Sequence, residues 1–334
     1  MKKLLAPLVG DASPVTVIGL CKNAGKTTAM RRLMVELGEE CLGLTSVGRD
    51  GEATDLVTGT EKPDLYIKAG DLFATARGMM HLCDVTMEVC ALTGVMTPLG
   101  EVAVFRALSD GYIQLAGPSA AGQLPALAQQ FAQLGAARVI IDGAAGRKSL
   151  AGAGVAGTAL LCTGASLDRD MELVVAETAH TCRLFACKRP ENPALCAALD
   201  GCAGRFALFR PDGTALELPV DESGAPRWNK FPREECVFWA AGGITDPLLK
   251  TLARRGAPLT LVAADATHIL AGRSALDLFT RTGGTLRVRR ELSIAAVGAN
   301  PWSAYGWHFD PEKFITALRR ALSLPVVNVK EEGL

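Results

Sequence analysis

The chain has 334 residues, of which 49% are hydrophobic and 21% charged, and its 35 basic residues balance its 35 acidic ones. This length and composition allow a substantial core in one large domain or two ordinary ones. The balanced charge argues against nucleic acid or a membrane surface as a partner. With no apolar run long enough for a membrane span or a signal peptide, we expect a cytoplasmic protein with ten reduced cysteines.

Apolar runs alternate with amphipathic stretches, which is typical of a mostly parallel sheet flanked by helices. The expected fold class is therefore α/β. The strands predicted in the first part of the chain are residues 15–18, 41–47, 64–68, 102–107, 112–116, 137–141 and 158–162. The predicted helices there are residues 29–37, 125–134 and 168–184. The turn Ser109-Asp110-Gly111 has the composition of a hairpin joining the strands on either side of it.

Proline- and glycine-rich segments interrupt this alternation after residue 187, and it then resumes. We therefore expect a nucleotide-binding domain over residues 1–187 and a second α/β lobe over residues 188–334. The lobe is predicted to contain strands at residues 236–240, 259–263 and 294–297 and a helix at residues 247–255.

The segment from Val15 to Thr28 carries the strongest functional signal, because a β-branched run enters a glycine-punctuated loop that ends in Gly-Lys-Thr-Thr before an amphipathic helix. Such a loop turns its backbone N–H groups toward a phosphate at the helix N-terminus. Lys26 is expected to reach the β- and γ-phosphates, and Thr27 to hold Mg²⁺. The loop is one residue longer than the consensus, since Gly19 lies six positions before Gly25. The predicted nucleotide-binding residues of the loop are Gly19, Lys22, Asn23, Ala24, Gly25, Lys26, Thr27 and Thr28.

Two carboxylates are candidates for the metal and for catalysis beside Lys26. Asp142 follows the β-branched run of residues 139–141, where a second Mg²⁺-orienting carboxylate is expected. Asp50 lies in a glycine-rich turn after the second strand, and it either serves Mg²⁺ and the attacking water or simply forms the turn. Whether Arg49, Arg147 or Lys148 acts in catalysis is left open.

The sequence gives less information about which nucleotide base is bound. A guanine-specific Asn-Lys-x-Asp is absent, so we expect ATP, with GTP as the alternative. Asn300 follows the last predicted strand and either contacts the purine or starts the Asn300-Pro301 turn.

Several longer runs resemble one particular family. They are Val47–Glu52, Thr58–Pro63, Arg106–Tyr112, Leu115–Ser119, Ile141–Ala144, Arg147–Leu150 and Asn300–Gly306. Together they resemble the smaller P-loop subunit of the lysine 5,6-aminomutase reactivase. More broadly, the segment Asp142–Gly146 resembles the switch of the class that includes nitrogenase iron protein and dethiobiotin synthetase. Lys22 is similar to the signature lysine with which some members of that class complete a neighbouring subunit's site, which makes a homodimer one alternative.

The resemblance implies an ATP- and Mg²⁺-dependent factor of amino acid fermentation. With a MutS-related ATPase subunit, such a factor releases damaged cobalamin from an adenosylcobalamin-dependent aminomutase. The chain has no Asp-x-His-x-x-Gly cobalt-ligand motif of its own. Two alternatives stay open. One is an ATP-dependent ligase resembling dethiobiotin synthetase, with Thr245, Asp246, Asp265 and His268 binding its substrate, and the other is a nucleotide-sensing regulator with little turnover.

Overall fold

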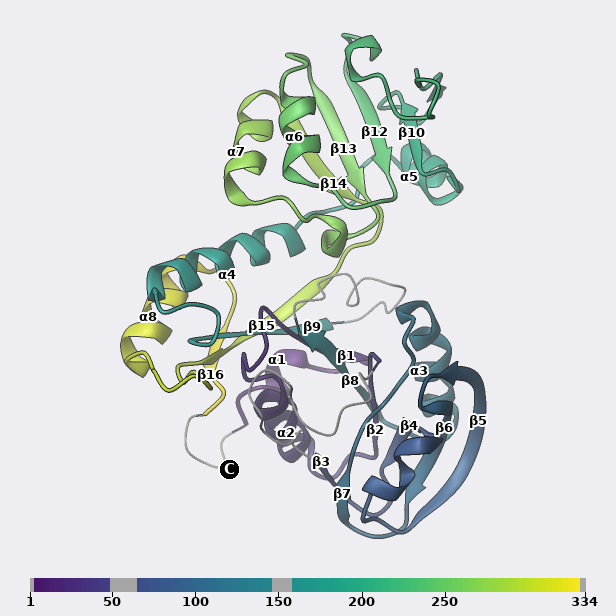
Figure 1. Ribbon diagram of the computed structural model, residues 1–334, viewed down its shortest axis with the longest axis vertical. Helices are drawn as coiled ribbons and strands as arrows, with labels where there is room; N and C mark the ends of the chain where they lie inside the picture. Colours follow the sequence, from purple (N-terminus) through teal and green to yellow (C-terminus); the bar gives the residue numbers. More distant parts are fainter. Residues whose placement is uncertain (1–2, 49–64, 146–157, 331–334) are drawn as a thin grey trace. The chain divides into compact units, whose positions relative to one another are not determined.

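A computed structural model describes residues 3–48, 65–145 and 158–330 (Figure 1). The chain forms two compact units, of which unit 1 combines Met1–Ala179 with Ser293–Leu334, and unit 2 is His180–Leu292. The sequence-based division at residue 187 assigned residues 293–334 to the second lobe. In the structure they return to unit 1, because β15 (Ser293–Asn300) pairs in parallel with β9 (Thr158–Gly164).

Unit 1 is built on a large mixed sheet that confirms the α/β class. Its strand order over the described residues is β16-β15-β9-β1-β8-β2-β4-β6-β5. Every neighbouring pair from β16 to β4 is parallel, whereas β6 runs antiparallel to both β4 and β5. The remaining strands are β1 (Val15–Gly19), β2 (Leu42–Ser46), β4 (Leu72–Ala76), β5 (Met87–Thr97), β6 (Gly100–Ala107), β8 (Arg138–Ala145) and β16 (Val326–Asn328).

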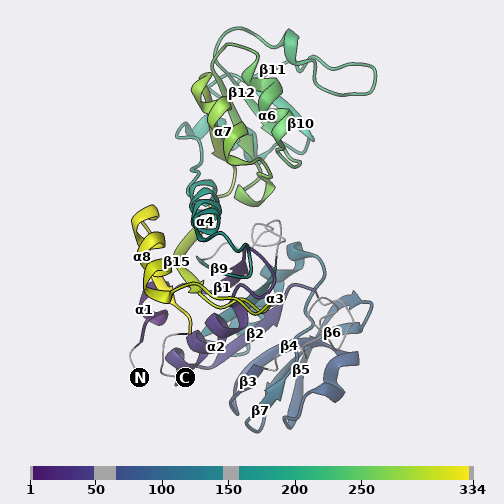
Figure 2. The ribbon, with the colours of Figure 1, turned by 60° about the vertical axis from the view of Figure 1, so that its left-hand side comes forward.

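The inner strands β1, β2 and β4 are buried on both faces, whereas the edge strand β5 is partly exposed. Phe73 and Phe105 belong to the core on the face that α2 covers, while Leu72 and Val104 belong to the core on the face that α3 covers (Figure 2). The helices of unit 1 are α1 (Ala6–Val9), α2 (Lys26–Leu37), α3 (Leu124–Gln133), α8 (Pro311–Ala321) and α4 (Met171–Phe185), which continues into unit 2, with short 3-10 helices η1 (Arg77–Leu82) and η2 (Ala121–Gln123).

The predicted hairpin at Ser109-Asp110-Gly111 is wrong. Strand β6 lies between β4 and β5, whereas β7 (Gly111–Ile113) pairs with β3 (Leu65–Ile67) in a separate two-stranded sheet. The reason is that the turn and the residue after it form hydrogen bonds with distant parts of the chain. Asp110 accepts a hydrogen bond from the Ala69 N–H over 2.8 Å, and Asp84 accepts one from the Tyr112 N–H.

A buried glutamate ties the N-terminal helix to unit 1. One carboxylate oxygen of Glu36, on α2, accepts hydrogen bonds from the N–H groups of Leu4, Leu5 and Ala6 over 2.7–2.9 Å. The other oxygen pairs with the Arg32 guanidinium over 2.8 Å. Burial alone would raise the pKa of Glu36, but the hydrogen bonds from Ala6, Arg32, Leu4 and Leu5 hold it below its ordinary value.

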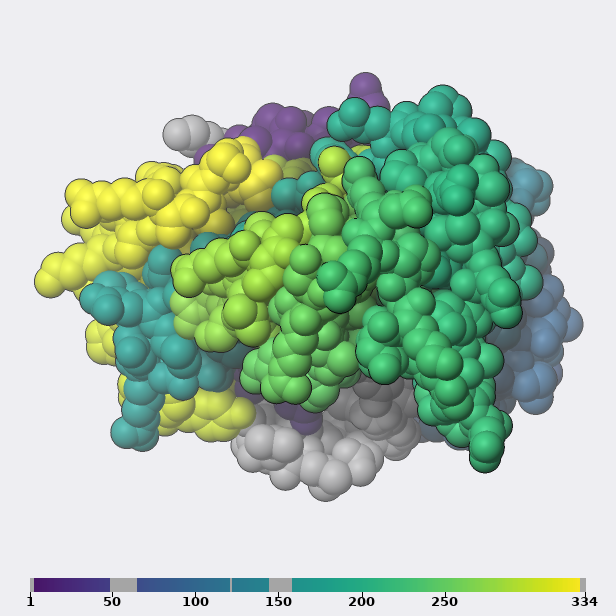
Figure 3. Space-filling view, turned by 90° about the horizontal axis from the view of Figure 1, so that it is seen from above, coloured from purple at the N-terminus to yellow at the C-terminus, as the bar shows by residue number. Residues whose placement is uncertain are grey.

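Unit 2 is a smaller α/β layer structure whose surface is green in Figure 3. Its sheet has the order β11-β10-β12-β13-β14, with β12, β13 and β14 parallel. One face packs on α6 and α7 and the other on α5. Its elements are α5 (Pro193–Asp200), β10 (Phe206–Phe209), β11 (Ala215–Leu216), η4 (Trp228–Lys230), β12 (Cys236–Ala240), α6 (Asp246–Ala253), β13 (Leu259–Ala263), η5 (Ala266–His268), α7 (Arg273–Arg281) and β14 (Gly284–Val288).

Two expectations about the whole chain can be compared with the structure. All ten cysteines are free in the structure. Among the described residues, none of the helices combines the length and the apolar character that crossing a membrane requires.

Candidate functional site

The segment that leaves β1 has the predicted strand–loop–helix form. After Gly19 the chain stays close to β9, since the Leu20 N–H donates to the Cys162 carbonyl over 3.0 Å. The loop then takes two left-handed residues, Asn23 at φ 58° and Gly25 at φ 95°, and α2 begins at Lys26. It therefore ends at the N-terminus of a twelve-residue helix, which is where phosphates bind in such loops.

Gly25 is required at its position for two independent reasons. Its φ of 95° lies in the left-handed region, which is costly for residues with a side chain. In addition, a Cβ at this position would lie 3.0 Å from the Asn300 Cβ and 3.1 Å from the Val329 Cγ2. The loop is thus pressed against the end of β15.

Lys26 and Asp142 lie together at the carboxyl ends of two adjacent parallel strands. The Lys26 Nζ is 3.4 Å from Asp142 Oδ1 and also donates to the Gly143 carbonyl. The two side chains are 15% and 32% exposed, so both reach solvent at this edge. The structure therefore brings together Lys26 and Asp142, and their assignment to a nucleotide site stays a prediction.

The strand that carries Asp142 is longer than predicted. Instead of stopping at Ile141, β8 continues to Ala145, and its register against β1 shifts between the pairs Val17–Asp142 and Gly19–Ala145. The shift accommodates Gly143, where a Cβ would lie 2.9 Å from the Val17 carbonyl oxygen. At this irregularity the Gly143 carbonyl accepts a hydrogen bond from the Lys26 Nζ.

The remaining loop residues are accessible to a ligand to different degrees. Lys22 and Asn23 are exposed, Thr27 and Thr28 are half-buried in the first turn of α2, and Ala24 is buried beneath the loop. A hydroxyl and a carboxylate at one sheet edge are hard oxygen donors of the kind that Mg²⁺ prefers. Thr27, in the first turn of α2, and Asp142, on β8, both carry oxygen donors of this kind. A site formed by three or more His, Cys, Asp or Glu side chains is not found in the described parts of the chain.

Two thiols near the loop are held protonated. Cys162 is fully buried on β9, and burial raises its pKa to about 12, although the Lys26 charge acts in the opposite direction. Burial likewise raises the pKa of the Cys21 thiol to about 11. Since the thiolate is the reactive form, both cysteines serve as small packing residues.

Asn300 has a clear role in the structure. It is buried at the end of β15, and its side-chain Nδ2 donates to the Asn23 carbonyl over 3.3 Å. Its Oδ1 accepts from the Trp302 N–H over 3.2 Å. Both ends of the amide are therefore engaged in holding the loop between β1 and α2 and the turn after β15. The predicted contact with a purine is not needed to explain this residue.

Four of the sequence-predicted residues fall outside the described part of the chain. They are Arg49, Asp50, Arg147 and Lys148. The roles considered for them stay predictions.

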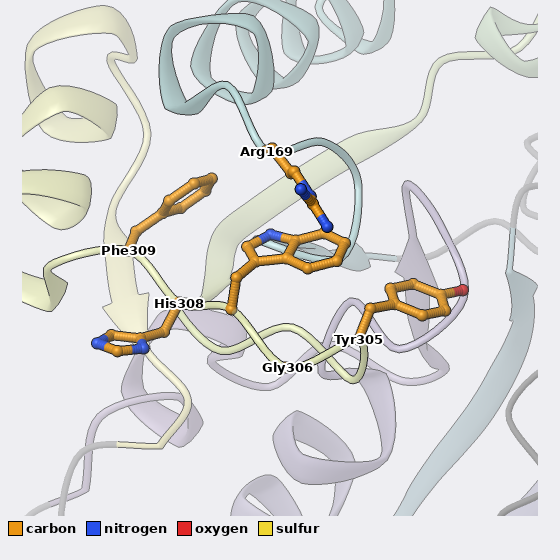
Figure 4. A pocket seen from close by; sticks show the side chains of 6 residues that line it. Arg169, Tyr305, Gly306, His308 and Phe309 are labelled. Atoms are coloured by element: carbon orange, nitrogen blue, oxygen red, sulfur yellow. The ribbon is translucent and has the colours of Figure 1, made fainter.

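A pocket of about 310 Å³ opens beside this edge of unit 1 (Figure 4). It is lined by Arg169, Tyr305, Gly306, Trp307, His308 and Phe309. The Arg169 guanidinium lies 4.8 Å from the centroid of the Trp307 ring, on which Tyr305 stacks with a centroid distance of 5.5 Å. The Trp307 indole N–H donates to the Ala165 carbonyl over 2.9 Å, which fixes the ring on the segment after β9.

The sequence analysis did not assign this pocket to a site. The signal available was three aromatic residues, Trp302, Tyr305 and Trp307, within ten positions of the end of the strand predicted at residues 294–297. The two ends of the segment that carries these aromatic residues are hydrogen-bonded to each other, since the Phe309 N–H donates to the Pro301 carbonyl over 2.9 Å. Arg169 comes from the loop before α4, and nothing in its local sequence connects it with residues more than a hundred positions later.

No protein-family model matches the chain, and no curated protein or solved structure matches it either.

Proposed function

We propose that this chain is an Mg²⁺- and ATP-dependent P-loop ATPase that acts as the smaller subunit of a reactivating factor for an adenosylcobalamin-dependent amino acid aminomutase. One observation carries the nucleotide part of the proposal. The Lys26 Nζ lies 3.4 Å from Asp142 at the carboxyl edge of β1 and β8, where the left-handed Gly25 leads into α2. The reactivase part rests on the resemblance of the sequence runs given above.

In this proposal the loop N–H groups and the N-terminus of α2 hold the phosphates, and Lys26 turns from Asp142 toward their terminal oxygens. Thr27 and Asp142 would hold Mg²⁺, which supplies charge compensation to the phosphates when bound. Asn300 keeps the loop in place through the Asn23 carbonyl. The aromatic pocket suits a purine base, because Tyr305 offers an exposed ring for stacking.

The nucleotide site would drive partner proteins rather than chemistry on a metabolite. Binding energy for ATP shifts a conformational equilibrium only when the two states bind ATP with different affinity. The ATP-bound state would join the MutS-related subunit in opening the mutase cofactor cleft, and hydrolysis would reset it.

The nucleotide part is tested by Mg²⁺-dependent ATP binding and hydrolysis with the wild-type chain, Lys26→Ala and a matched control. Lys68→Ala serves as the control, because Lys68 is exposed and its Nζ contacts only the Gly38 carbonyl among the contacts described. We expect binding to be lost in Lys26→Ala alone. Equal affinity in all three proteins would refute the phosphate site.

The reactivase part is tested separately with inactivated mutase, the MutS-related subunit, ATP and Mg²⁺, following cobalamin exchange by absorbance. We expect exchange to require this chain and to fail with Lys26→Ala. Exchange that proceeds equally without the chain or without ATP would overturn the reactivase while leaving the nucleotide site intact.

An ATP-dependent ligase is the second candidate, because polar side chains lie at the carboxyl ends of strands in unit 2. A ligase would need a metabolite for turnover, whereas the reactivase would respond to protein partners. A regulator would remain slow with either. Hydrolysis assays with metabolites and with partners therefore separate the three.

A further inference from the structure

Unit 2 contains a buried carboxylate that the nucleotide site does not use. Asp265 follows β13 directly and is fully buried. Its Oδ1 accepts hydrogen bonds from the Thr267 N–H over 3.0 Å, from the Thr267 hydroxyl and from His268 Nδ1 over 2.9 Å. Its Oδ2 lies 3.3 Å from the Arg290 Nη2.

Asp265 is charged in this setting. Burial alone would raise its pKa, but the hydrogen bonds from His268 and Thr267 hold the pKa below its usual range. A carboxylate can only accept hydrogen bonds, so His268 must present Nδ1–H to it. The other ring nitrogen, Nε2, is thereby left for a different partner.

Both groups that Asp265 orients reach the surface. The side chains of His268 and Arg290 are 27% and 43% exposed, whereas that of Asp265 is 0% exposed. His268 lies just after β13 and Arg290 just after β14, the neighbouring parallel strand. Open α/β sheets bind ligands at the carboxyl ends of parallel strands, so the two groups lie where a ligand is expected.

An exposed apolar side chain lies beside this polar pair. Ile269 is buried and forms a parallel bridge with Ile244, so the side chains before and after it point outward. The next residue, Leu270, is a large apolar side chain that is mostly exposed. Gly243 faces it without a side chain, and a Cβ there would lie 3.0 Å from Leu270 Cδ1.

We propose that the carboxyl edge of β13 and β14 is a second ligand site, in which Arg290 and His268, oriented by Asp265, bind the carboxylate or phosphate group of a small molecule. The Arg290 guanidinium pairs with the anionic oxygens, a geometry for which guanidinium groups are well suited. His268 Nε2 bonds to the same group or to a neighbouring hydroxyl. The site does not depend on the proposed ATPase.

The test uses the full chain and NMR of its histidine side chains, with inorganic phosphate and malonate as probes. The chain has four histidines, so His268→Gln identifies the resonance of interest. We expect a saturable shift of the His268 signals with one or both anions. Phosphate alone would indicate a phosphate ligand, malonate alone a carboxylate, and both an anion site of either kind.

Two arginine variants of β14 and the segment after it provide the matched comparison. Arg290→Gln should weaken anion binding by about tenfold or more, and Arg290→Lys should recover part of the loss. Arg287→Gln removes the same charge three residues earlier and should leave binding unchanged. In the Lys26→Ala background the His268 response should persist.

Three results would overturn the proposal. They are the absence of a saturable His268 shift with either anion, equal weakening in Arg287→Gln and Arg290→Gln, and loss of the shift in Lys26→Ala. The first would reduce the cluster to a network that satisfies the buried Asp265.

Discussion

The Asn300 side chain donates to the Asn23 carbonyl over 3.3 Å, so a residue at the end of β15 holds the loop between β1 and α2, 277 positions earlier in the chain. The same asparagine limits the space at Gly25, where a Cβ would approach its Cβ to 3.0 Å. The loop is therefore shaped by unit 1 as a whole and not only by its own sequence.

Asn300→Ala removes this support. We expect Mg-ATP to bind about tenfold more weakly and the free energy of unfolding to fall by about 2 kcal/mol, the usual contribution of the two hydrogen bonds that the side chain makes. Isothermal titration and urea unfolding measure the two effects. Asn328→Ala is the control, because Asn328 ends the neighbouring strand β16 and contacts only the Lys330 N–H among the contacts described. Unchanged affinity in Asn300→Ala would contradict the bracing role.

Gly25→Ala tests the fit of the loop against β15. The substitution introduces a left-handed alanine, at a cost of about 1–2 kcal/mol, and presses its Cβ on Asn300 and Val329. Gly70→Ala separates the two effects, since Gly70 has a φ of 97° and open space around its Cβ position. We expect Gly25→Ala to destabilise the chain more than Gly70→Ala in urea unfolding and to abolish nucleotide binding. Equal destabilisation would show that the contacts with β15 cost nothing.

The local parts of the fold could be predicted from the sequence. The strand β1, the loop and α2 follow from one continuous pattern, and the β-branched residues before Asp142 indicate β8. These elements carry their own periodicity and turn residues. Lys26 and Asp142 could be paired because adjacent parallel strands end at the same edge.

The long-range parts could not be predicted in the same way. The hairpin at Asp110 fails because Ala69 and Asp84, distant in sequence, provide the actual partners. The return of β15 to the first sheet depends on its pairing with β9, which local pattern does not encode. The contact between the Arg169 guanidinium and the Trp307 ring likewise joins residues far apart in the sequence, so local pattern does not encode it.

Asp142→Asn keeps the shape of the side chain but removes the charge that would orient the metal. We expect nucleotide affinity to persist in part and Mg²⁺-dependent hydrolysis to fall by two orders of magnitude or more, roughly the effect of removing a metal-orienting carboxylate. The measurement is a Mg²⁺ titration of ATP hydrolysis for the variant and the wild-type chain. An identical Mg²⁺ dependence would assign Asp142 to holding Lys26 alone.

Glu36→Gln tests the buried carboxylate that ties α1 to α2. The pKa of Glu36 is lower in the folded chain than its ordinary value of 4.5, so the unfolded state takes up a proton first as the pH falls. The stability that the carboxylate provides is therefore fully present above about pH 4.5 and is lost as the pH falls through the folded pKa.

Glutamine removes the charge and leaves Arg32 buried without its 2.8 Å ion pair to Glu36. At neutral pH we expect the variant to lose about 3 kcal/mol, as is typical when one partner of a buried pair is removed. The difference from wild type should stay constant down to about pH 4.5 and shrink below it, which urea unfolding between about pH 7 and about pH 2 measures. Glu39→Gln, exposed three residues further along, should change stability by less than about 0.5 kcal/mol at every pH. A constant difference between Glu36→Gln and wild type across this range would mean that the hydrogen bonds to Leu4, Leu5 and Ala6 do not depend on the charge of Glu36.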